Sequence, residues 1–567
     1  MTSVDKQDRL SNKKVSLYLS LATLALCLAY YYSAVIDINF FKTSLPDLGP
    51  MPDGQEYLAS AVSFVKYGKF GLRIGNDFLP SRYPFGFSLI LVPFAYFSTP
   101  EKLVRVPYIV NGLIGLAMLI GTFLFYFLQK RFIASGLSVL LLVTLPSFII
   151  FSRSSLSENL GVFILLISLL LAYFSICTRN SSYLVVSAFI LGLGLSVRLQ
   201  LILFVPMLGA SLFLKNKGSN VSENLRERLI YLLLIFLAFL LGALPLLIYN
   251  LKTFGSLLST GYEFWVPGTV TFKLDFFFLN IASLWRDFSL SRVDYKVANL
   301  FGPGMYFTPV FLVFALISSI YVFLRVGLGG KIVALGVFSY LLGTLFYPYS
   351  YDARFYYPIL IISAFLITQL MEDFLFFPKE FGSHYPAIRF LTRNYYGSSK
   401  KALIFLIFLI LVGFPSASGF PPGFNFSQTT ALLEKSYLGN QSFLYPPIIA
   451  YLRSHENGRK TLLVTDIIPI LPTTILQENI TVIPVNEHHE FMHSNMWKFG
   501  LVERDGYILK ALSLGDRLVY ISKEVVDPNQ ILPVSDSIWK KVSSENDSFI
   551  IAELVSKSKL SEEEINR

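Results

Sequence analysis

Long apolar runs separated by short polar stretches fill most of the first 420 residues. Eleven of these runs are long enough, or nearly so, to cross a hydrocarbon core of about 30 Å as helices. They lie near residues 15–36, 106–128, 133–151, 157–178, 182–197, 200–214, 227–250, 306–325, 331–348, 356–377 and 401–417. The shorter run 84–98 is either a twelfth span or a re-entrant helix. The pattern predicts an α-helical polytopic membrane protein with about 11–13 transmembrane helices.

The pattern changes after residue 417. Short apolar runs such as "TLLVTDIIPIL" and "RLVYISKEVV" alternate with polar, helix-like stretches such as "YILKALSLG". This alternation is typical of a small soluble α/β domain. The sequence therefore predicts a transmembrane module over 1–417, with a first external loop at 37–83, and a soluble α/β domain over 418–567.

Composition agrees with the membrane class. Hydrophobic residues make up 54% of the 567 positions and charged residues only 15%, which is too apolar for a soluble protein. The formal net charge of +10 is typical of Lys and Arg held in cytoplasmic loops, so we expect no nucleic-acid partner. Cys27 and Cys177 both lie inside apolar runs and are interpreted as core residues.

The basic segments orient the spans. Lys and Arg are concentrated in short stretches at 1–14, 129–131, 214–228 and 377–401, which the positive-inside rule assigns to the cytoplasm. The N-terminus is then cytoplasmic in a multi-pass cell-membrane protein. The segments predicted outside are the loop 37–83, the turn 152–157, the loop 251–305, the turn 347–355 and the tail after 417.

Polar residues at membrane depth are costly and mark functional sites. Asp53 in "PDGQEY" opens a helical pattern that we expect to lie in the membrane interface. Asp53 is also a typical N-cap, and Glu56 three residues later nearly completes a capping box. The two roles are compatible, because a capping carboxylate is held in place.

Further polar residues gather on the same predicted outer side. Arg82 and Tyr83 precede Pro84 in "SRYPFGF", where a simple interfacial anchor is the alternative interpretation. Glu158 in "RSSLSENLG" begins a span, a position that the helix dipole also favours for structural reasons.

Arg198 interrupts a long apolar stretch in "GLGLSVRLQ" and lines either a polar cavity or a tight external turn. Arg354 in "YPYSYDARFYYP" and Tyr262 in "FGSLLSTGYEFW" complete the candidates. The histidine-rich "NEHHEFMH" lacks zinc-ligand spacing on a clear helix, so we interpret it as a solvated loop and predict no metal site.

The ordered set "PDGQEYLASAVSF", "RSSLSENLGVFILLISLLLAYF", "LGLGLSVRLQLILFVP" and "DARFYYPILIISAFLI" resembles the GT-C superfamily of polytopic glycosyltransferases. Within it, the set is most similar to the branch of protein O-mannosyltransferases and lipid A aminoarabinose transferases. The resemblance covers residues 1–375, and the tail looks like the extracytoplasmic domain that many members carry.

The resemblance implies roles for the candidates. Asp53 corresponds to the catalytic loop aspartate and Glu158 to a second acidic position, whereas Arg82, Arg198 and Arg354 stand where the family keeps cations near the lipid phosphate. The chain departs from the paired Asp-Glu of the mannosyltransferases. Gly54 follows Asp53, which argues against protein mannosylation and against metal binding at this point.

The implied reaction moves a sugar from a polyprenyl-phosphate donor to a hydroxyl on a glycan, lipid or protein acceptor, outside the cytoplasm. One base and one phosphate clamp imply a single displacement with inversion. In this hypothesis Asp53 is the base and Arg198 and Arg354 bind the phosphate. Glu158 binds a hydroxyl or orients an arginine, and Tyr83 and Tyr262 contact the sugar.

Two other classes of function stay open. A flippase or transporter of a lipid-linked saccharide would place charges at mid-membrane, and a non-catalytic scaffold would leave the outer charges as anchors. No cofactor is expected beyond the lipid-linked donor, with room left for a divalent metal.

Overall fold

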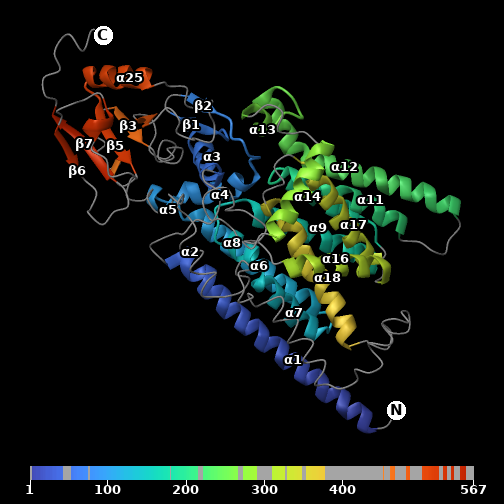
Figure 1. Cartoon of the computed structure of the whole chain (residues 1–567). Helices are drawn as coiled ribbons and strands as arrows, with labels where there is room; N and C mark the ends of the chain where they lie inside the picture. The colour runs from blue at the N-terminus through green and yellow to red at the C-terminus, as the bar shows by residue number, and fades with distance from the viewer. Residues whose placement is uncertain are drawn as a thin grey trace. The chain divides into compact units, whose positions relative to one another are not determined.

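The computed structural model of the chain is mainly α-helical, with a small β-sheet near the C-terminus (Figure 1). It describes residues 3–41, 53–74, 77–178, 180–214, 221–265, 273–289, 309–325, 328–347, 353–376, 451–452, 460–465, 480–485, 501–522, 528–532, 538–541 and 550–556. The predicted span 401–417, the histidine-rich segment and the predicted domain boundary at 417/418 lie outside these residues.

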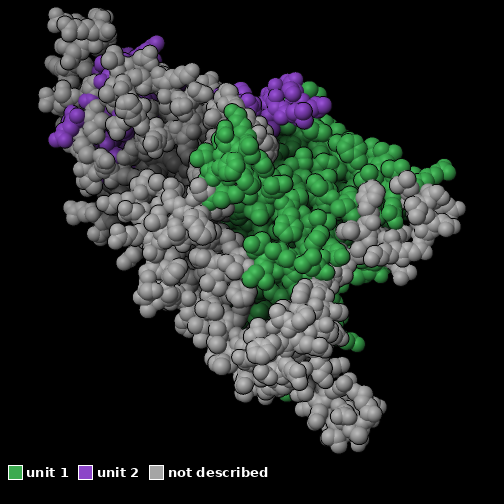
Figure 2. Space-filling view, turned by 45° about the vertical axis from the view of Figure 1, so that its right-hand side comes forward, with its two compact units in different colours: residues 1–42, 108–252, 268–438 green, residues 43–107, 253–267, 439–567 purple. Residues whose placement is uncertain are grey.

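The chain divides into two compact units, which Figure 2 colours separately. Unit 1 comprises residues 1–42, 108–252 and 268–438, and unit 2 comprises residues 43–107, 253–267 and 439–567. Each unit is therefore built from segments that are far apart in the sequence.

Unit 1 is a helical bundle. Its helices are α1 (Ser3–Tyr31), α2 (Asp37–Phe41), α6 (Val106–Phe127), α7 (Phe132–Thr144), α8 (Pro146–Ser152), α9 (Glu158–Thr178), α10 (Ser182–Gly194), α11 (Val205–Leu214), α12 (Val221–Phe254), α14 (Leu274–Ser289), α16 (Pro309–Arg325), α17 (Leu328–Leu345) and α18 (Tyr357–Phe376). A π-helical turn, η1 (Tyr32–Ile36), joins α1 to α2, and the 3₁₀ helices η2 (Leu199–Phe204) and η3 (Ala353–Tyr356) precede α11 and α18.

Five helical stretches among the described residues are long and apolar enough to cross a membrane: Lys14–Phe41, Val106–Phe127, Glu158–Thr178, Arg226–Phe254 and Arg354–Glu372. Six shorter apolar helices accompany them: Gly86–Phe97, Phe132–Thr144, Ser182–Gly194, Leu199–Leu212, Ala315–Leu324 and Gly330–Leu345. The α-helical polytopic class is confirmed, and the predicted 11–13 spans include helices shorter than a full crossing.

Small and hydroxyl-bearing residues hold the bundle together. A Cβ at Gly192 of α10 would lie 2.2 Å from the Phe239 carbonyl oxygen of α12, and one at Gly242 would lie 2.1 Å from the Phe189 oxygen. The two backbones therefore touch at this crossing, as small residues permit in membrane bundles. Hydroxyl groups also link helices, as in the 2.7 Å hydrogen bond between Ser168 of α9 and Ser187 of α10.

Unit 2 begins with α3 (Asp53–Tyr67), a hairpin of β1 (Leu72–Ile74) and β2 (Asp77–Leu79), α4 (Gly86–Phe97) and α5 (Pro100–Leu103), to which the 253–267 segment adds α13 (Gly261–Trp265). The first eleven residues of α3, Asp53–Ser63, are all buried, so this part of the helix packs against protein. Its expected place in the membrane interface stays a prediction. Helix α4 has 12 residues and a length of about 18 Å, so it cannot be a complete twelfth span.

The C-terminal part of unit 2 is a small α/β domain, as predicted. Strands β3 (Thr461–Thr465), β4 (Ile480–Pro484), β5 (Arg517–Ser522), β6 (Ile538–Lys541) and β7 (Ile550–Ser556) form a sheet in the order β4-β3-β5-β7-β6. β3 runs parallel to β4 and β5, and β7 runs antiparallel to β5 and β6. Helices α25 (Leu501–Ser513) and α26 (Pro528–Ile531) complete it, and its core includes Val464, Ile508 and Tyr520.

Candidate functional site

Two carboxyl groups of α3 share one arginine in unit 2. Asp53 and Glu56 are three residues apart and so lie on the same face of the helix. The Nη2 atom of Arg82 donates to Asp53 Oδ1 at 2.7 Å and lies 3.5 Å from Glu56 Oε1. We call these three residues the α3 cluster. It holds two carboxyl groups and one guanidinium.

The segment before α4 is hydrogen-bonded to the carboxyl group of Glu56. The backbone N–H of Arg82 donates to Glu56 Oε2 at 3.3 Å, and the Ser81 hydroxyl donates to it at 3.4 Å. Gly261 of α13 packs directly on this segment, because a Cβ there would lie 2.1 Å from the Ser81 carbonyl oxygen. Glu56, fully buried, thus fixes the position of Arg82.

Aromatic rings surround the α3 cluster. Tyr83 is 6% exposed and packs against Tyr57, with ring centroids 4.8 Å apart, and against Tyr262 in a T-shaped contact at 5.5 Å. The Arg82 guanidinium lies 4.7 Å from the Tyr83 ring centroid. Burial raises the pKa of Tyr83 well above 10, so the phenol is neutral at physiological pH. Burial lowers the pKa of Arg82, but Tyr83, Glu56 and Asp53 outweigh it and raise that pKa overall, so the guanidinium stays charged.

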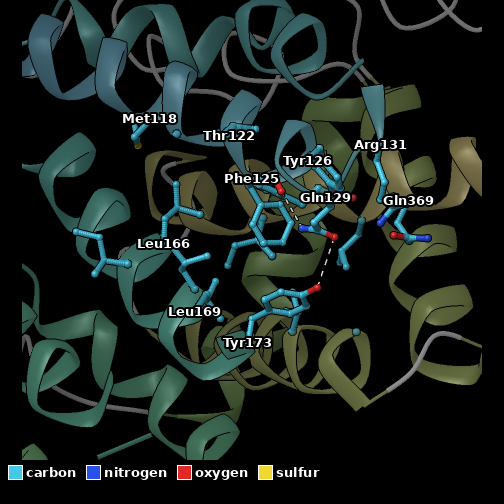
Figure 3. A pocket seen from close by; sticks show the side chains of 18 of the residues that line it. Met118, Thr122, Phe125, Tyr126, Gln129, Arg131, Leu166, Leu169, Tyr173 and Gln369 are labelled. Carbon is cyan, nitrogen blue, oxygen red and sulfur yellow. Dashed lines mark hydrogen bonds between the residues drawn. The ribbon is translucent and has the colours of Figure 1, made fainter. Parts of the chain in front are cut away.

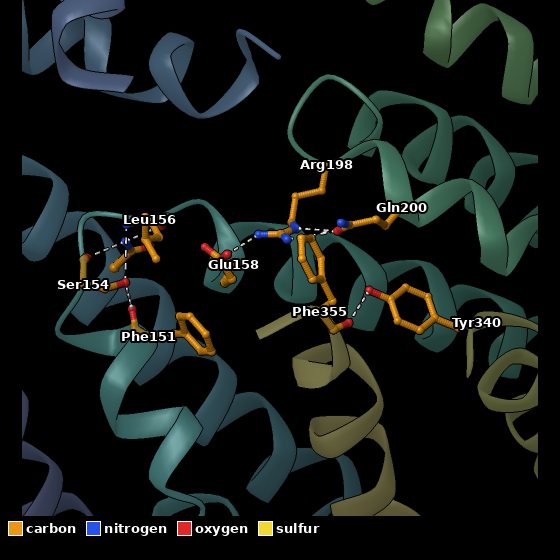
Figure 4. Close-up of polar contacts among 9 residues, drawn as sticks. Phe151, Ser154, Leu156, Glu158, Arg198, Gln200, Tyr340 and Phe355 are labelled. Atoms are coloured by element: carbon orange, nitrogen blue, oxygen red, sulfur yellow. Dashed lines mark hydrogen bonds and ion pairs between the residues drawn. The ribbon is translucent and has the colours of Figure 1, made fainter. Parts of the chain in front are cut away.

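A second pair forms in unit 1, at the start of α9. Arg198 Nη1 lies 2.5 Å from Glu158 Oε1, and its Nε and Nη2 donate to Gln200 Oε1 at 3.1 and 3.0 Å (Figure 4). We call Glu158, Arg198 and Gln200 the α9 cluster. Gly161 leaves room for the arginine, since a Cβ there would lie 2.8 Å from Arg198 Cδ.

The second oxygen of Glu158 is available to a ligand. Glu158 is 3% exposed, and its Oε2 atom is buried without a hydrogen-bond partner among the described residues. A buried acceptor of this kind is costly unless something binds it. The α9 cluster can therefore accept one further hydrogen bond from a hydroxyl or a water.

Arg354 belongs to η3, which reaches the α9 cluster through Tyr340. The Tyr340 hydroxyl donates to the carbonyl oxygen of Phe355 at 2.8 Å, and Tyr340 lies within electrostatic range of Arg198 and Glu158. Figure 4 shows Phe355 and Tyr340 beside the arginine. The turn that carries Arg354 is thus close to the Glu158–Arg198 ion pair.

A buried hydrogen-bond network positions the turn before Glu158. Asn111 Nδ2 donates to the carbonyl oxygens of Ser154 and Leu156 at 2.8 and 2.7 Å. These two carbonyl groups lie between α8 and α9, where no helical hydrogen bond satisfies them. The Tyr357 hydroxyl donates to Asn159 Oδ1 at 2.6 Å. This bond ties the start of α9 to the start of α18.

The structure brings the predicted residues together in two clusters, one in each unit. Asp53 and Arg82, with Tyr83 and Tyr262 packed around them, lie in unit 2, whereas Glu158, Arg198 and Arg354 lie in unit 1. Sequence reasoning gave Glu56 only a capping role, although its i+3 spacing from Asp53 was the signal for a shared partner. It gave no role to Gln200, which interrupts the same apolar stretch as Arg198.

No group of three or more His, Cys, Asp or Glu residues that could hold a metal occurs among the described residues. The expected absence of a metal stays a prediction, because the histidine-rich segment lies beyond them.

Comparisons with known proteins give matches only at the level of structure. The sequence matches no family model and no curated protein. The structure is similar to the oligosaccharyltransferase of Archaeoglobus fulgidus in its apo form, with 13% identity, a TM-score of 0.54, and coverage of 89% of this chain and 69% of that chain. The same enzyme tethered to an acceptor peptide with the NVT sequon matches with 13% identity and a TM-score of 0.53, over the same shares of the two chains.

ArnT from Cupriavidus metallidurans, in a structure bound to undecaprenyl phosphate, matches with 11% identity and a TM-score of 0.51. That match covers 94% of this chain and 98% of ArnT. Both proteins are GT-C members, and at these identities the likeness concerns the fold alone. The chain therefore shares its fold with these two GT-C proteins, which agrees with the resemblance in its sequence.

Proposed function

We propose that the chain is a glycosyltransferase that moves a sugar from a polyprenyl-phosphate donor to an acceptor hydroxyl on the extracytoplasmic side of the cell membrane. The observation that carries the proposal is the pair of buried clusters, which place a carboxylate and an arginine next to each other at the start of α3 and again at the start of α9. The shared fold with ArnT, solved with undecaprenyl phosphate, supports a lipid-linked donor.

Asp53 is the proposed base. It is 3% exposed, and Arg82 holds one of its oxygens at 2.7 Å, so its carboxylate has a defined position. The same guanidinium also contacts Glu56, so the cluster contains two carboxyl groups and one cation. In the proposed step the Asp53 carboxylate takes the proton of the attacking hydroxyl. Attack on the anomeric carbon with loss of the phosphate is a single displacement and inverts the configuration.

Arg198 and Arg354 are the proposed phosphate ligands. As the donor's C–O bond breaks, negative charge develops on the departing lipid phosphate, and fixed guanidinium donors stabilise that charge. Glu158 and Gln200 hold Arg198 in one orientation. The second oxygen of Glu158 accepts from a donor or acceptor hydroxyl, and Tyr83 and Tyr262 contact the sugar.

The test compares two isosteric substitutions on one helix. Membranes that contain wild-type protein, Asp53→Asn or Glu56→Gln are supplied with a radiolabelled polyprenyl-phosphate sugar and a crude acceptor pool. Asp53→Asn should lower transfer by about 10²–10⁴-fold, because it removes the base but keeps the shape. It also removes one partner of the buried Asp53–Arg82 ion pair, so the unfolding temperature should fall for this variant too. Glu56→Gln should lower the unfolding temperature and retain most transfer, because Glu56 positions Arg82.

Near-normal transfer by Asp53→Asn would remove Asp53 from the mechanism, and loss confined to Glu56→Gln would reassign the base to Glu56. If wild-type membranes move the labelled lipid between leaflets and transfer no sugar, the flippase is the correct function. A cysteine placed at an exposed position of the C-terminal sheet and labelled from outside intact cells tests the proposed orientation.

A further inference from the structure

Unit 1 contains a cavity that neither cluster uses. It has a volume of about 280 Å³ and lies between α6, α9, α16, α17 and α18 (Figure 3). Three of these helices, α6, α9 and α18, contain stretches long and apolar enough to cross a membrane. The cavity is therefore at the depth of the lipid chains.

The cavity is amphiphilic along its length. Its deep walls are apolar and include Met118, Phe163 and Leu166. Its polar groups gather at one end, where Gln129, Arg131, Tyr173 and Gln369 line it. The Tyr173 hydroxyl donates to Gln129 Oε1 at 3.5 Å, which joins the ends of α6 and α9 at this point.

This polar end is remote from the α9 cluster. Tyr173 stands fifteen residues after Glu158 on α9, a distance of about 22 Å along the helix axis. Gln369 stands twelve residues after Tyr357 on α18, or about 18 Å. The polar end therefore belongs to the opposite leaflet from the Glu158–Arg198 pair, which separates this cavity from the head group of the proposed donor.

The polar end carries positive charge. Arg131 forms an ion pair with Glu372 and stacks 5.2 Å from the Tyr126 ring centroid, with 27% of its side chain exposed. A guanidinium has five N–H donors, and the ion pair with Glu372 occupies one of its terminal nitrogens. Lys130, exposed next to it, adds a second cation. Together they match a phosphate group at the membrane surface.

The hydroxyl group of Thr122 indicates that the cavity binds a ligand. Thr122 lines the cavity, is 3% exposed, and its Oγ1 atom is buried without a hydrogen-bond partner among the described residues. Thr144, Thr178 and Thr368 bond instead to a carbonyl oxygen of the preceding turn. Thr122 stands about 10 Å along α6 from Gln129, on the apolar side of the polar end.

We propose that this cavity binds one membrane phospholipid with an anionic head group, taken from the leaflet on the side of the 129–131 turn. One acyl chain fills the apolar part between α6 and α9, where water would find few partners. The Thr122 hydroxyl donates to an ester carbonyl, and the phosphate binds Arg131 and Gln129. The lipid then fills the gap between α6, α9 and α18 and stabilises their packing.

The first experiment measures retained lipid. Wild-type protein purified in a mild detergent should carry a stoichiometric amount of phospholipid, identified by extraction and mass spectrometry. Gly121→Phe should abolish retention, because a side chain at Gly121 enters open space in the cavity wall without a clash. Ile120→Phe is the matched control: this neighbour is 39% exposed, does not line the cavity, and should retain the lipid.

The second experiment measures stability in detergent with added dioleoyl-phosphatidylglycerol or dioleoyl-phosphatidylcholine. Phosphatidylglycerol should raise the unfolding temperature of the wild type by about 2 °C or more, and that of Gly121→Phe not at all. Thr122→Val, which keeps the shape, should reduce the shift. The double variant Arg131→Gln/Glu372→Gln leaves no buried charge unpaired and should respond equally to both lipids.

Equal phospholipid retention by wild type and Gly121→Phe would overturn the proposal. So would an equal response of both proteins to phosphatidylglycerol, or a polyprenyl chain in place of the phospholipid. These readouts do not involve sugar transfer, so they stand or fall independently of the proposed function.

Discussion

The two clusters use carboxyl and guanidinium groups in different proportions. In the α3 cluster one guanidinium serves two carboxyl groups, whereas in the α9 cluster one carboxyl group serves one guanidinium that is also held by neutral Gln200. The turn that carries Arg354 adds a cation near the α9 cluster. One cluster therefore contains more carboxyl groups than guanidinium groups, whereas the other contains one of each.

The difference matters because the proposed transfer needs both signs. Proton removal from a hydroxyl requires a basic carboxylate, and departure of a lipid phosphate requires fixed cations. The buried arginines are thus not interchangeable: Arg82 is shared by two carboxyl groups, and Arg198 pairs with one.

The largest effect should follow from Arg198→Gln. It removes a proposed phosphate ligand and should lower transfer by about 10²–10³-fold. It also leaves Glu158 buried without its cation, which should cost about 3–5 kcal/mol in the free energy of unfolding. The double variant Arg198→Gln/Glu158→Gln should recover much of the unfolding temperature but none of the transfer. Recovery of transfer as well would mean that the α9 cluster is only structural.

Alanine substitutions of the glycine beside each cluster should have smaller effects, which differ between the two clusters. Gly261→Ala forces a Cβ against the carbonyl oxygen of Ser81, so the backbone must move, at a cost of about 1–3 kcal/mol. Gly161→Ala meets only the flexible chain of Arg198, and alanine also favours the helix, so the unfolding temperature should hardly change. Displacement of Arg198 should still lower transfer by about 10–10²-fold. Equal unfolding temperatures of the two variants would contradict the packing described for the α3 cluster.

The smallest effect should come from Tyr357→Phe. Loss of the 2.6 Å hydrogen bond leaves Asn159 Oδ1 without this donor and should cost about 1–2 kcal/mol. Tyr126→Phe is a fitting control, because it loses a bond to the Phe365 carbonyl oxygen further along α18. Both variants should lower the unfolding temperature. Only Tyr357→Phe should lower transfer, because Tyr357 bonds to Asn159, the residue next to Glu158. Identical transfer by the two variants would show that the network does not position the α9 cluster.

Sequence patterns predicted the elements better than the contacts between them. The apolar run at 157–178 gave α9 almost to the residue, because helix length and apolar content are local properties. The burial of α3 could not be predicted, since an amphipathic face that meets lipid and one that meets protein have the same spacing. The Glu158–Arg198 pair joins residues forty positions apart, and no periodicity links them.

The contact between α10 and α12 also limits which missense mutations the bundle tolerates. Every amino-acid replacement of glycine adds a Cβ, so no missense mutation at Gly192 or Gly242 preserves the backbone contact there. A missense change at either codon acts on the packing of α10 against α12. Loss of activity from such an allele would reflect, first of all, less folded protein in the membrane.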